Sequence, residues 1–151
     1  MTSTGAAESI RPRISFYEDH GRYGGILSWI LTSDHKRIGI LYFTFVIASF
    51  FSGVVLGFFM RLEMLAPGGS IMTPQTYNSL FTLHGIVMIF LVVIPAIPTI
   101  FGNFFLPIQI GARDVAFPRI NLLSWWLYIS GAAIVALSVF TGEGPPDTGW
   151  T

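Results

Sequence analysis

The chain has 151 residues, of which 52% are apolar and only 11% are charged. Soluble domains carry about 25% charged residues, so this composition excludes an ordinary soluble domain and predicts a membrane protein. The eight basic and eight acidic residues give zero net charge, a balance that gives no indication of a nucleic-acid partner.

The first 37 residues are predicted to form a solvated arm. They carry nine charged side chains and have no apolar run before the first hydrophobic segment, so they do not form a signal peptide. Near the end of this arm, residues 23–31 contain Trp29 and are predicted to lie at the membrane interface, since tryptophan favours the headgroup level.

Residues 38–60 are predicted to form the first transmembrane helix. The segment holds no charge and would be roughly 35 Å long as a helix, enough to cross a bilayer. Ser49, Gly53 and Gly57 recur every four residues along it. Such a stripe allows close approach of a second helix, although small residues are common enough in these helices to occur there by chance.

The second predicted transmembrane helix covers residues 77–106, within an apolar stretch that starts at Thr73. Thr73 followed by Pro74 is a helix start signal, with the threonine as N-cap. Two further prolines, at positions 95 and 98, are expected to kink its second half, and Pro107 is expected to end it.

The third predicted helix covers residues 121–141. Trp125 and Trp126 near its start are typical of an interfacial belt. The fold class is therefore an all-α membrane protein with three transmembrane helices.

The basic residues predict the orientation of these helices. Seven of the eight precede the first helix or lie in loop 107–120, and only Arg61 lies in the other compartment. The positive-inside rule therefore puts the N-terminal arm and loop 107–120 in the cytoplasm. It puts loop 61–76 and the tail 142–151 outside, and it puts His84 in the outer part of the second helix.

His84 is the most informative residue, because it is the one His, Asp, Glu, Lys or Arg residue between Met64 and Ala112. A titratable imidazole in hydrocarbon is costly and therefore indicates a functional site. It can ligate a heme iron, relay protons, or form a structural hydrogen bond. Gly85 beside it leaves room for a planar group, and Met88, one turn further on, can pack on a macrocycle or simply fill the core.

The remaining charged residues have an ordinary and a functional interpretation. In the ordinary interpretation, Arg61 and Glu63 form a pair at the headgroups. In the functional interpretation, Arg61 binds a polar group of a cofactor. Glu63 then binds a cation together with the carbonyls of Ala66 and Gly68. Asp114 is either an exposed partner of Arg113 or a proton-collecting carboxylate.

Two amides are predicted near the same membrane face as Asp114. Asn103 and Asn121 either help to hold a chain of ordered waters there or act as helix caps, and Asn121 is especially suited to capping.

Six motifs resemble subunit I of the heme–copper respiratory oxidases, in the cytochrome c oxidase (aa3-type) branch, over about residues 27–151. They are DHKRIG at 34–39, RLEMLAPG at 61–68, TLHGIVMIF at 82–90, FGNFFLP at 101–107, IGARDVAFPRIN at 110–121 and TGWT at 148–151. The resemblance implies that the three helices are the N-terminal part of a twelve-helix bundle in a bacterial-type inner membrane.

The resemblance also implies roles for residues at a heme. His84 looks like one of the two axial ligands of the low-spin heme, and Arg61 is similar to the arginine that bonds the formyl group of heme A. Trp150 resembles a residue near the heme propionates. Met88, one turn beyond His84, is expected to lie beside the macrocycle.

Two more sites are implied in the same way. Glu63, Ala66 and Gly68 match positions of a calcium or sodium site, although Ser70 stands where some relatives have glutamine. Asp114, together with Asn103 and Asn121, resembles the entrance of the D proton pathway.

The assembled enzyme would reduce oxygen to water with electrons from cytochrome c and pump protons. It would need the remainder of subunit I, subunits II and III, heme a3 and CuB, because the copper ligands and the second low-spin heme ligand lie on later helices. The quinol branch is disfavoured, since Ser52, Leu56, Thr76 and Ser79 stand where its quinone-binding residues align.

Two alternatives stay open at this point. One is a proton-coupled transporter or channel component that uses His84 without heme. The other is a non-catalytic assembly fragment that retains the family sequence.

Overall fold

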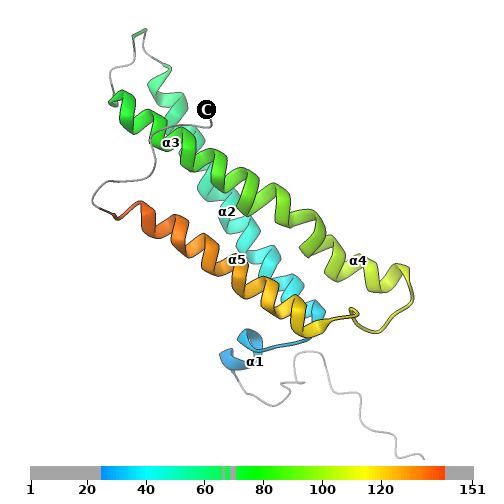
Figure 1. Cartoon of the computed structure of the whole chain (residues 1–151). Helices are drawn as coiled ribbons and strands as arrows, with labels where there is room; N and C mark the ends of the chain where they lie inside the picture. Colours follow the sequence, from blue (N-terminus) through cyan, green and yellow to red (C-terminus); the bar gives the residue numbers. More distant parts are fainter. Residues whose placement is uncertain (1–24, 66, 69–70, 142–151) are drawn as a thin grey trace, which may run out of the picture. The chain divides into compact units, whose positions relative to one another are not determined.

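The computed structural model describes residues 25–65, 67–68 and 71–141, and every element in these ranges is helical. Three helical stretches there are long and apolar enough to cross a membrane, which confirms the predicted fold class (Figure 1). The chain divides into two units, residues 1–31 and 32–151, and each is described by itself. Most of the predicted N-terminal arm and tail 142–151 lie outside the described residues.

The described part of the first unit contains one short helix, α1 (Ile26–Ile30). Gly25 precedes it with a φ of 64°, a conformation that glycine adopts without steric cost. The hydroxyl of Ser28 donates to the Gly25 carbonyl at 2.7 Å and closes the turn.

Helix α2 (His35–Glu63) begins three residues before the predicted start of the first transmembrane helix, because Asp34 caps it. The Asp34 carboxylate accepts a hydrogen bond from the backbone N–H of Lys36 at 2.9 Å. This bond satisfies one of the donors that a helix N-terminus leaves free, so the polar residues at 35–37 join the helix.

The second membrane-length stretch, Pro74–Gln109, is made of four consecutive segments. They are α3 (Pro74–Ile86), the π-helical η1 (Val87–Val93) and η2 (Ala96–Phe101), and α4 (Gly102–Gln109). Thr73 is the N-cap, as predicted, and its hydroxyl accepts from the Thr76 N–H. The expectation that Pro107 ends the helix is wrong, because α4 continues through it to Gln109.

The prolines at 95 and 98 lie in or beside the π-helical turns. A proline at 95 supplies no N–H to the carbonyl of Leu91, four residues earlier. The hydroxyl of Tyr128 on the third helix donates to that carbonyl instead, and the Thr99 hydroxyl donates to the carbonyl of Pro95 itself. The Tyr128 hydroxyl thus supplies a donor to the carbonyl whose partner four residues later is a proline.

Helix α5 (Pro118–Ser138) begins one turn earlier than predicted. Phe117 is its N-cap and Pro118 occupies the first turn, where its missing N–H costs nothing. Asn121 therefore lies inside the helix, so the interpretation of Asn121 as a cap is wrong.

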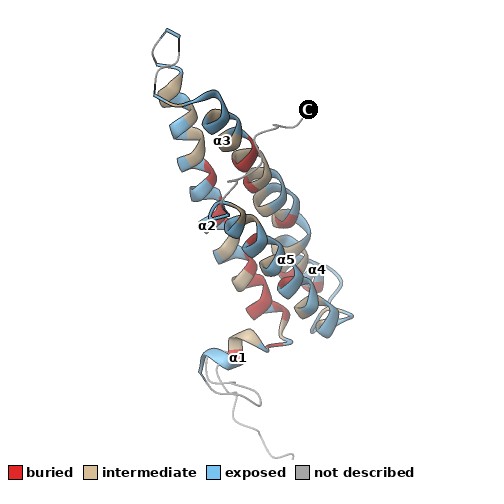
Figure 2. Ribbon diagram, turned by 60° about the vertical axis from the view of Figure 1, so that its left-hand side comes forward, coloured by how far each residue is buried: buried red, intermediate tan, exposed pale blue. Residues whose placement is uncertain are grey.

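Helix α2 contacts every other helix of the second unit, and the buried residues gather along it (Figure 2). Near its N-terminal end, Ile38 and Tyr42 pack with Trp125 of α5 in a buried cluster. The Tyr42 and Trp125 rings meet edge to face with centroids 5.0 Å apart.

The stripe of Ser49, Gly53 and Gly57 is confirmed as a packing surface. Ser49 and Gly53 are buried, and a Cβ atom built on Gly53 would lie 2.5 Å from the Sδ of Met88. A larger residue there would have to displace the Met88 side chain, so glycine favours this close approach of α2 to the α3–η1 segment.

Candidate functional site

His84 lies in the last turn of α3 and faces the small-residue stripe of α2. Its Nδ1 is 2.8 Å from the carbonyl oxygen of Gly53. Its Cε1 is 3.2 Å from the place where a Cβ on Gly57 would stand. Gly57 therefore makes room for the imidazole, and the Gly53 carbonyl oxygen lies within hydrogen-bond distance of it.

The contact with Gly53 fixes the tautomer of His84. A carbonyl oxygen only accepts hydrogen bonds, so Nδ1 carries the proton and donates it. In the neutral ring the lone pair is then on Nε2, and within the described residues no hydrogen bond engages that nitrogen. This is the arrangement typical of metal-ligating histidines, whose other nitrogen donates to a carbonyl or carboxylate.

Met88 lies one turn after His84 on the same helical stretch. Its Sδ and Cγ are the nearest atoms to the position of a Cβ on Gly53. Met88 thus packs against α2, and this contact accounts for its place without a macrocycle. Trp150 lies outside the described residues, so its role beside heme propionates stays a prediction.

Arg61 and Glu63 end α2 but do not form an ion pair in the described part of the chain. Arg61 is exposed. The Oε2 of Glu63 accepts hydrogen bonds from the backbone N–H groups of Ile71 at 3.1 Å and Met72 at 3.0 Å. The carboxylate therefore holds the far end of the 64–73 loop against the end of α2.

The predicted cation site is only partly described. Ala66 and Ser70 lie outside the described residues, and Gly68 is in the loop with a φ of 99°. Among the residues that are described, no three His, Cys, Asp or Glu side chains gather as a metal-binding group. The cation site stays a prediction.

Asp114 is held by His35, a partner that the sequence analysis did not identify. The Oδ1 of Asp114 lies 2.7 Å from the Nδ1 of His35 and also accepts from the N–H of Val115 at 2.7 Å. The His35 side chain is only 6% exposed, whereas that of Asp114 is 45% exposed. One face of the carboxylate is thus fixed to the start of α2 and the other remains open to solvent.

Asn103 and Asn121 are joined to each other. The amide of Asn121 donates to the side-chain oxygen of Asn103, whose own amide donates to the Thr99 carbonyl. Asn103 is 4% exposed, so this pair is a polar contact inside the helix packing.

The polar contacts continue from Asn121 to Tyr42. Ser124 donates to the Asn121 carbonyl at 2.7 Å, and its hydroxyl lies 2.9 Å from the Tyr42 hydroxyl. Tyr42 and Ser124 were missed by the sequence analysis. The one available signal for Tyr42 was a phenol in an otherwise uncharged, apolar segment. Nothing in the sequence marks Ser124 as its partner.

Comparison with known proteins gives a consistent result. The family model described as Cytochrome C and Quinol oxidase polypeptide I matches residues 37–151. The chain is 41% identical over 125 residues to a probable cytochrome c oxidase subunit 1-alpha of Streptomyces coelicolor. The aligned region covers 83% of this chain and 22% of that relative.

Two other relatives give the same match. A putative cytochrome c oxidase subunit 1-beta of Streptomyces avermitilis is 44% identical, covering 83% of this chain and 22% of that protein. A cytochrome c oxidase subunit 1 of Alkalihalophilus pseudofirmus is 41% identical, with 83% and 20% covered. The chain thus spans about a fifth of the length of the curated relatives it matches.

Proposed function

Because the chain belongs to the Cytochrome C and Quinol oxidase polypeptide I family, we propose that it forms three membrane-spanning helices of subunit I of a cytochrome c oxidase. The assembled enzyme would pass electrons from cytochrome c to oxygen and pump protons. The rest of subunit I, with heme a3 and CuB, and subunits II and III would complete it.

His84 is proposed as an axial ligand of the low-spin heme, and its hydrogen bond to Gly53 is the observation that carries the proposal. Nδ1–H donates to a backbone carbonyl, so Nε2 presents a lone pair from a fixed ring. When bound, the heme supplies a one-electron carrier. The chain's part is to hold the imidazole in one tautomer and one orientation.

Arg61 is proposed to bond the formyl group of heme A. Its guanidinium is exposed at the end of α2. Because Glu63 accepts hydrogen bonds from the loop amides, the Arg61 guanidinium is available to an external partner. Met88 and Trp150 are proposed to lie beside that heme. Separately, Glu63, Ala66 and Gly68 are proposed as ligands of a calcium or sodium ion.

Asp114 is proposed as the entrance of the D proton pathway. Its carboxylate is open to solvent on one side and hydrogen-bonded to His35 on the other. Asn103, Asn121, Ser124 and Tyr42 form a connected polar path from the same end of the helices, where ordered water can be held.

The two proposed sites are far apart along the helices. His35 begins α2, and the Gly53 carbonyl that fixes His84 lies eighteen residues later, roughly 27 Å along the helix axis. This is most of the thickness of a bilayer's hydrocarbon core. The separation suits an enzyme that collects protons at one face and receives electrons near the other, with the N-terminus on the cytoplasmic side.

The decisive experiment is a heme spectrum of the whole oxidase with His84→Ala, beside Ile89→Leu as a control on the same helical stretch. We expect the low-spin heme band to be lost in His84→Ala and retained in Ile89→Leu. An unchanged band in His84→Ala would refute the ligand assignment. Absence of heme from the native complex would favour the transporter or assembly-fragment alternatives.

The proton pathway is tested separately with Asp114→Asn and His35→Gln. We expect Asp114→Asn to abolish most proton uptake and pumping while the heme spectrum stays normal. His35→Gln removes the imidazole but keeps the carboxylate, so it should impair uptake less. Undiminished pumping in Asp114→Asn would refute the entrance assignment.

A further inference from the structure

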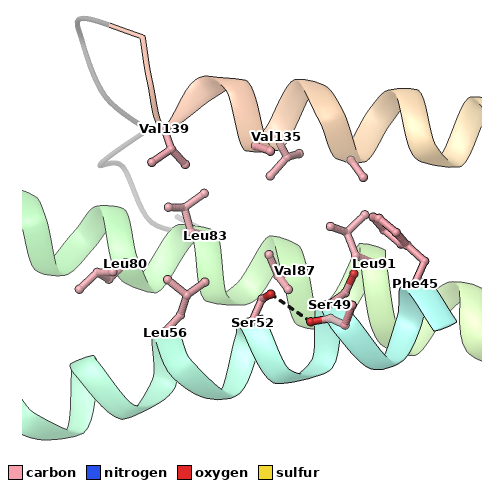
Figure 3. Close-up of a pocket in the computed structure, with 13 residues that line it drawn as sticks. Phe45, Ser49, Ser52, Leu56, Leu80, Leu83, Val87, Leu91, Val135 and Val139 are labelled. Carbon is pink, nitrogen blue, oxygen red and sulfur yellow. Dashed lines mark hydrogen bonds between the residues drawn. The ribbon is translucent and has the colours of Figure 1, made fainter.

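Tyr128 of α5 connects the two helical stretches that hold His84. Its hydroxyl donates a hydrogen bond to the backbone carbonyl of Leu91 in η1. The Ser49 side chain of α2 is hydrogen-bonded to the same Tyr128 side chain. Figure 3 shows Ser49 and Leu91 near each other on neighbouring helical stretches. One phenol oxygen from a third helix therefore bridges the other two.

The two hydrogen bonds use the phenol oxygen in different ways. A hydroxyl has one proton, and Tyr128 gives it to the Leu91 carbonyl, which can only accept. The lone pairs of the phenol oxygen are then left to accept the proton of the Ser49 hydroxyl. Ser49 is 6% exposed, so water does not compete for this bond. Phenylalanine at position 128 would lose both bonds, and alanine at position 49 would lose one.

The local structure directs the Tyr128 hydroxyl to this position. The centroid of its ring lies 5.3 Å from that of Tyr42 and 5.4 Å from that of Phe45, both on α2. Aromatic contacts of this kind favour a defined ring orientation. The Leu91 carbonyl receives no α-helical hydrogen bond from Pro95, because proline has no N–H. The donor and the acceptor are thus both in place for the bridge.

The bridge lies close to the hydrogen bond between His84 and Gly53. On α2, Ser49 comes four residues before Gly53, roughly 6 Å along the helix axis. On the other stretch, Leu91 comes seven residues after His84. The direct contact of His84 with the Gly53 carbonyl, at 2.8 Å, and the contact through Tyr128 therefore fasten the same pair of helical stretches. Any sliding of α2 against the α3–η1 stretch would disturb both contacts.

We propose that Tyr128 is a positioning residue for His84 and acts through the two helical stretches that it bridges. This inference rests on the proposed function, in which the Nε2 of His84 binds the low-spin heme. Donation from Nδ1–H to a carbonyl makes an imidazole a more basic ligand. Hydrogen bonding of this kind is one way in which a protein sets the reduction potential of a heme. By keeping Gly53 against His84, Tyr128 helps to set that potential.

The test is a spectroelectrochemical titration of the low-spin heme in the complete oxidase with Tyr128→Phe. If Nδ1–H donates less strongly, His84 becomes a less basic ligand and stabilises the ferric heme less. We expect the reduction equilibrium to shift about two- to tenfold toward the ferrous form, the range that the loss of one hydrogen bond gives. An unchanged potential in Tyr128→Phe would overturn the proposal.

Tyr42→Phe is the matched control, because it removes the same chemical group from a different contact. The Tyr42 hydroxyl lies 2.9 Å from that of Ser124 and joins α2 to α5. We expect both phenylalanine variants to lower the melting temperature of the oxidase, and only Tyr128→Phe to change the heme potential. Equal shifts of the potential in the two variants would indicate a general loosening of the helices and would also overturn the positioning role.

Two further variants decide the remaining outcomes. Ser49→Ala removes one arm of the bridge and should shift the potential in the same direction by a smaller factor. Where Tyr128→Phe does not assemble, an unchanged potential in Ser49→Ala refutes the proposal. His84→Ala separates this inference from the proposed function. If it loses the low-spin band while Tyr128→Phe keeps the native potential, only the role of Tyr128 is wrong. If it retains the band, the ligand assignment fails and this inference fails with it.

Discussion

Gly53→Ala tests how closely α2 and the α3–η1 stretch must pack to hold His84. The new Cβ would lie 2.5 Å from the Sδ of Met88, 3.1 Å from its Cγ and 3.5 Å from Val87. Overpacking of this kind costs about 1–3 kcal/mol, and alanine regains about 1 kcal/mol of helix propensity. We therefore expect a net loss of about 1 kcal/mol and a weakened hydrogen bond from His84 to the Gly53 carbonyl.

The assay is thermal unfolding of the complete oxidase together with the position of its low-spin heme band. Gly131→Ala is the matched control, because a Cβ there meets no atom within 4 Å, and it should be neutral or stabilising. Met88→Ala in the Gly53→Ala background should relieve the clash, with a coupling of about 0.5–3 kcal/mol between the two changes. If Gly53→Ala behaves like Gly131→Ala and shows no coupling to Met88, the reasoning is refuted.

Three further predictions concern side chains that make hydrogen bonds. Tyr42→Phe removes a buried hydroxyl 2.9 Å from Ser124, so thermal unfolding should show a loss of about 0.5–1.5 kcal/mol; an unchanged melting temperature would contradict it. Glu63→Ala removes the acceptor of two loop amides, so limited proteolysis within 64–73 should be faster than in Glu63→Gln, which keeps an acceptor; equal rates would count against that role. Thr73→Ala should cost about 0.5–2 kcal/mol in thermal unfolding, whereas Thr73→Ser should retain the cap, and equal losses would exclude a capping role.

Much of the fold follows from the sequence because membrane helices are specified locally. An uncharged run long enough to cross the bilayer must satisfy its own backbone hydrogen bonds, and a helix does so. The Thr73 cap was predictable for the same reason, since capping involves residues only three positions apart. The prediction for Pro107 failed because a proline clash inside a helix can be accommodated when neighbouring groups rearrange.

The partners of the polar residues were not predictable, because they lie far apart in the sequence. His35 and Asp114 are separated by 79 positions, and Tyr42 and Ser124 by 82. The prediction that Asn121 caps a helix failed for a local reason, since α5 already starts at Pro118 and Asn121 lies inside the helix, where its amide donates to Asn103.

By itself, the sequence predicted three membrane-spanning helices in this chain and one costly imidazole in the second, because hydrophobic length and the cost of a titratable group in hydrocarbon are properties of the chain alone. Only the tertiary structure decided which nitrogen of that imidazole is free, because the Gly53 carbonyl that takes the Nδ1 proton comes from another helix. The stripe of small residues on α2 predicted a close approach of a second helix, but only the structure shows that Met88 and His84 are the side chains that lie against its glycines.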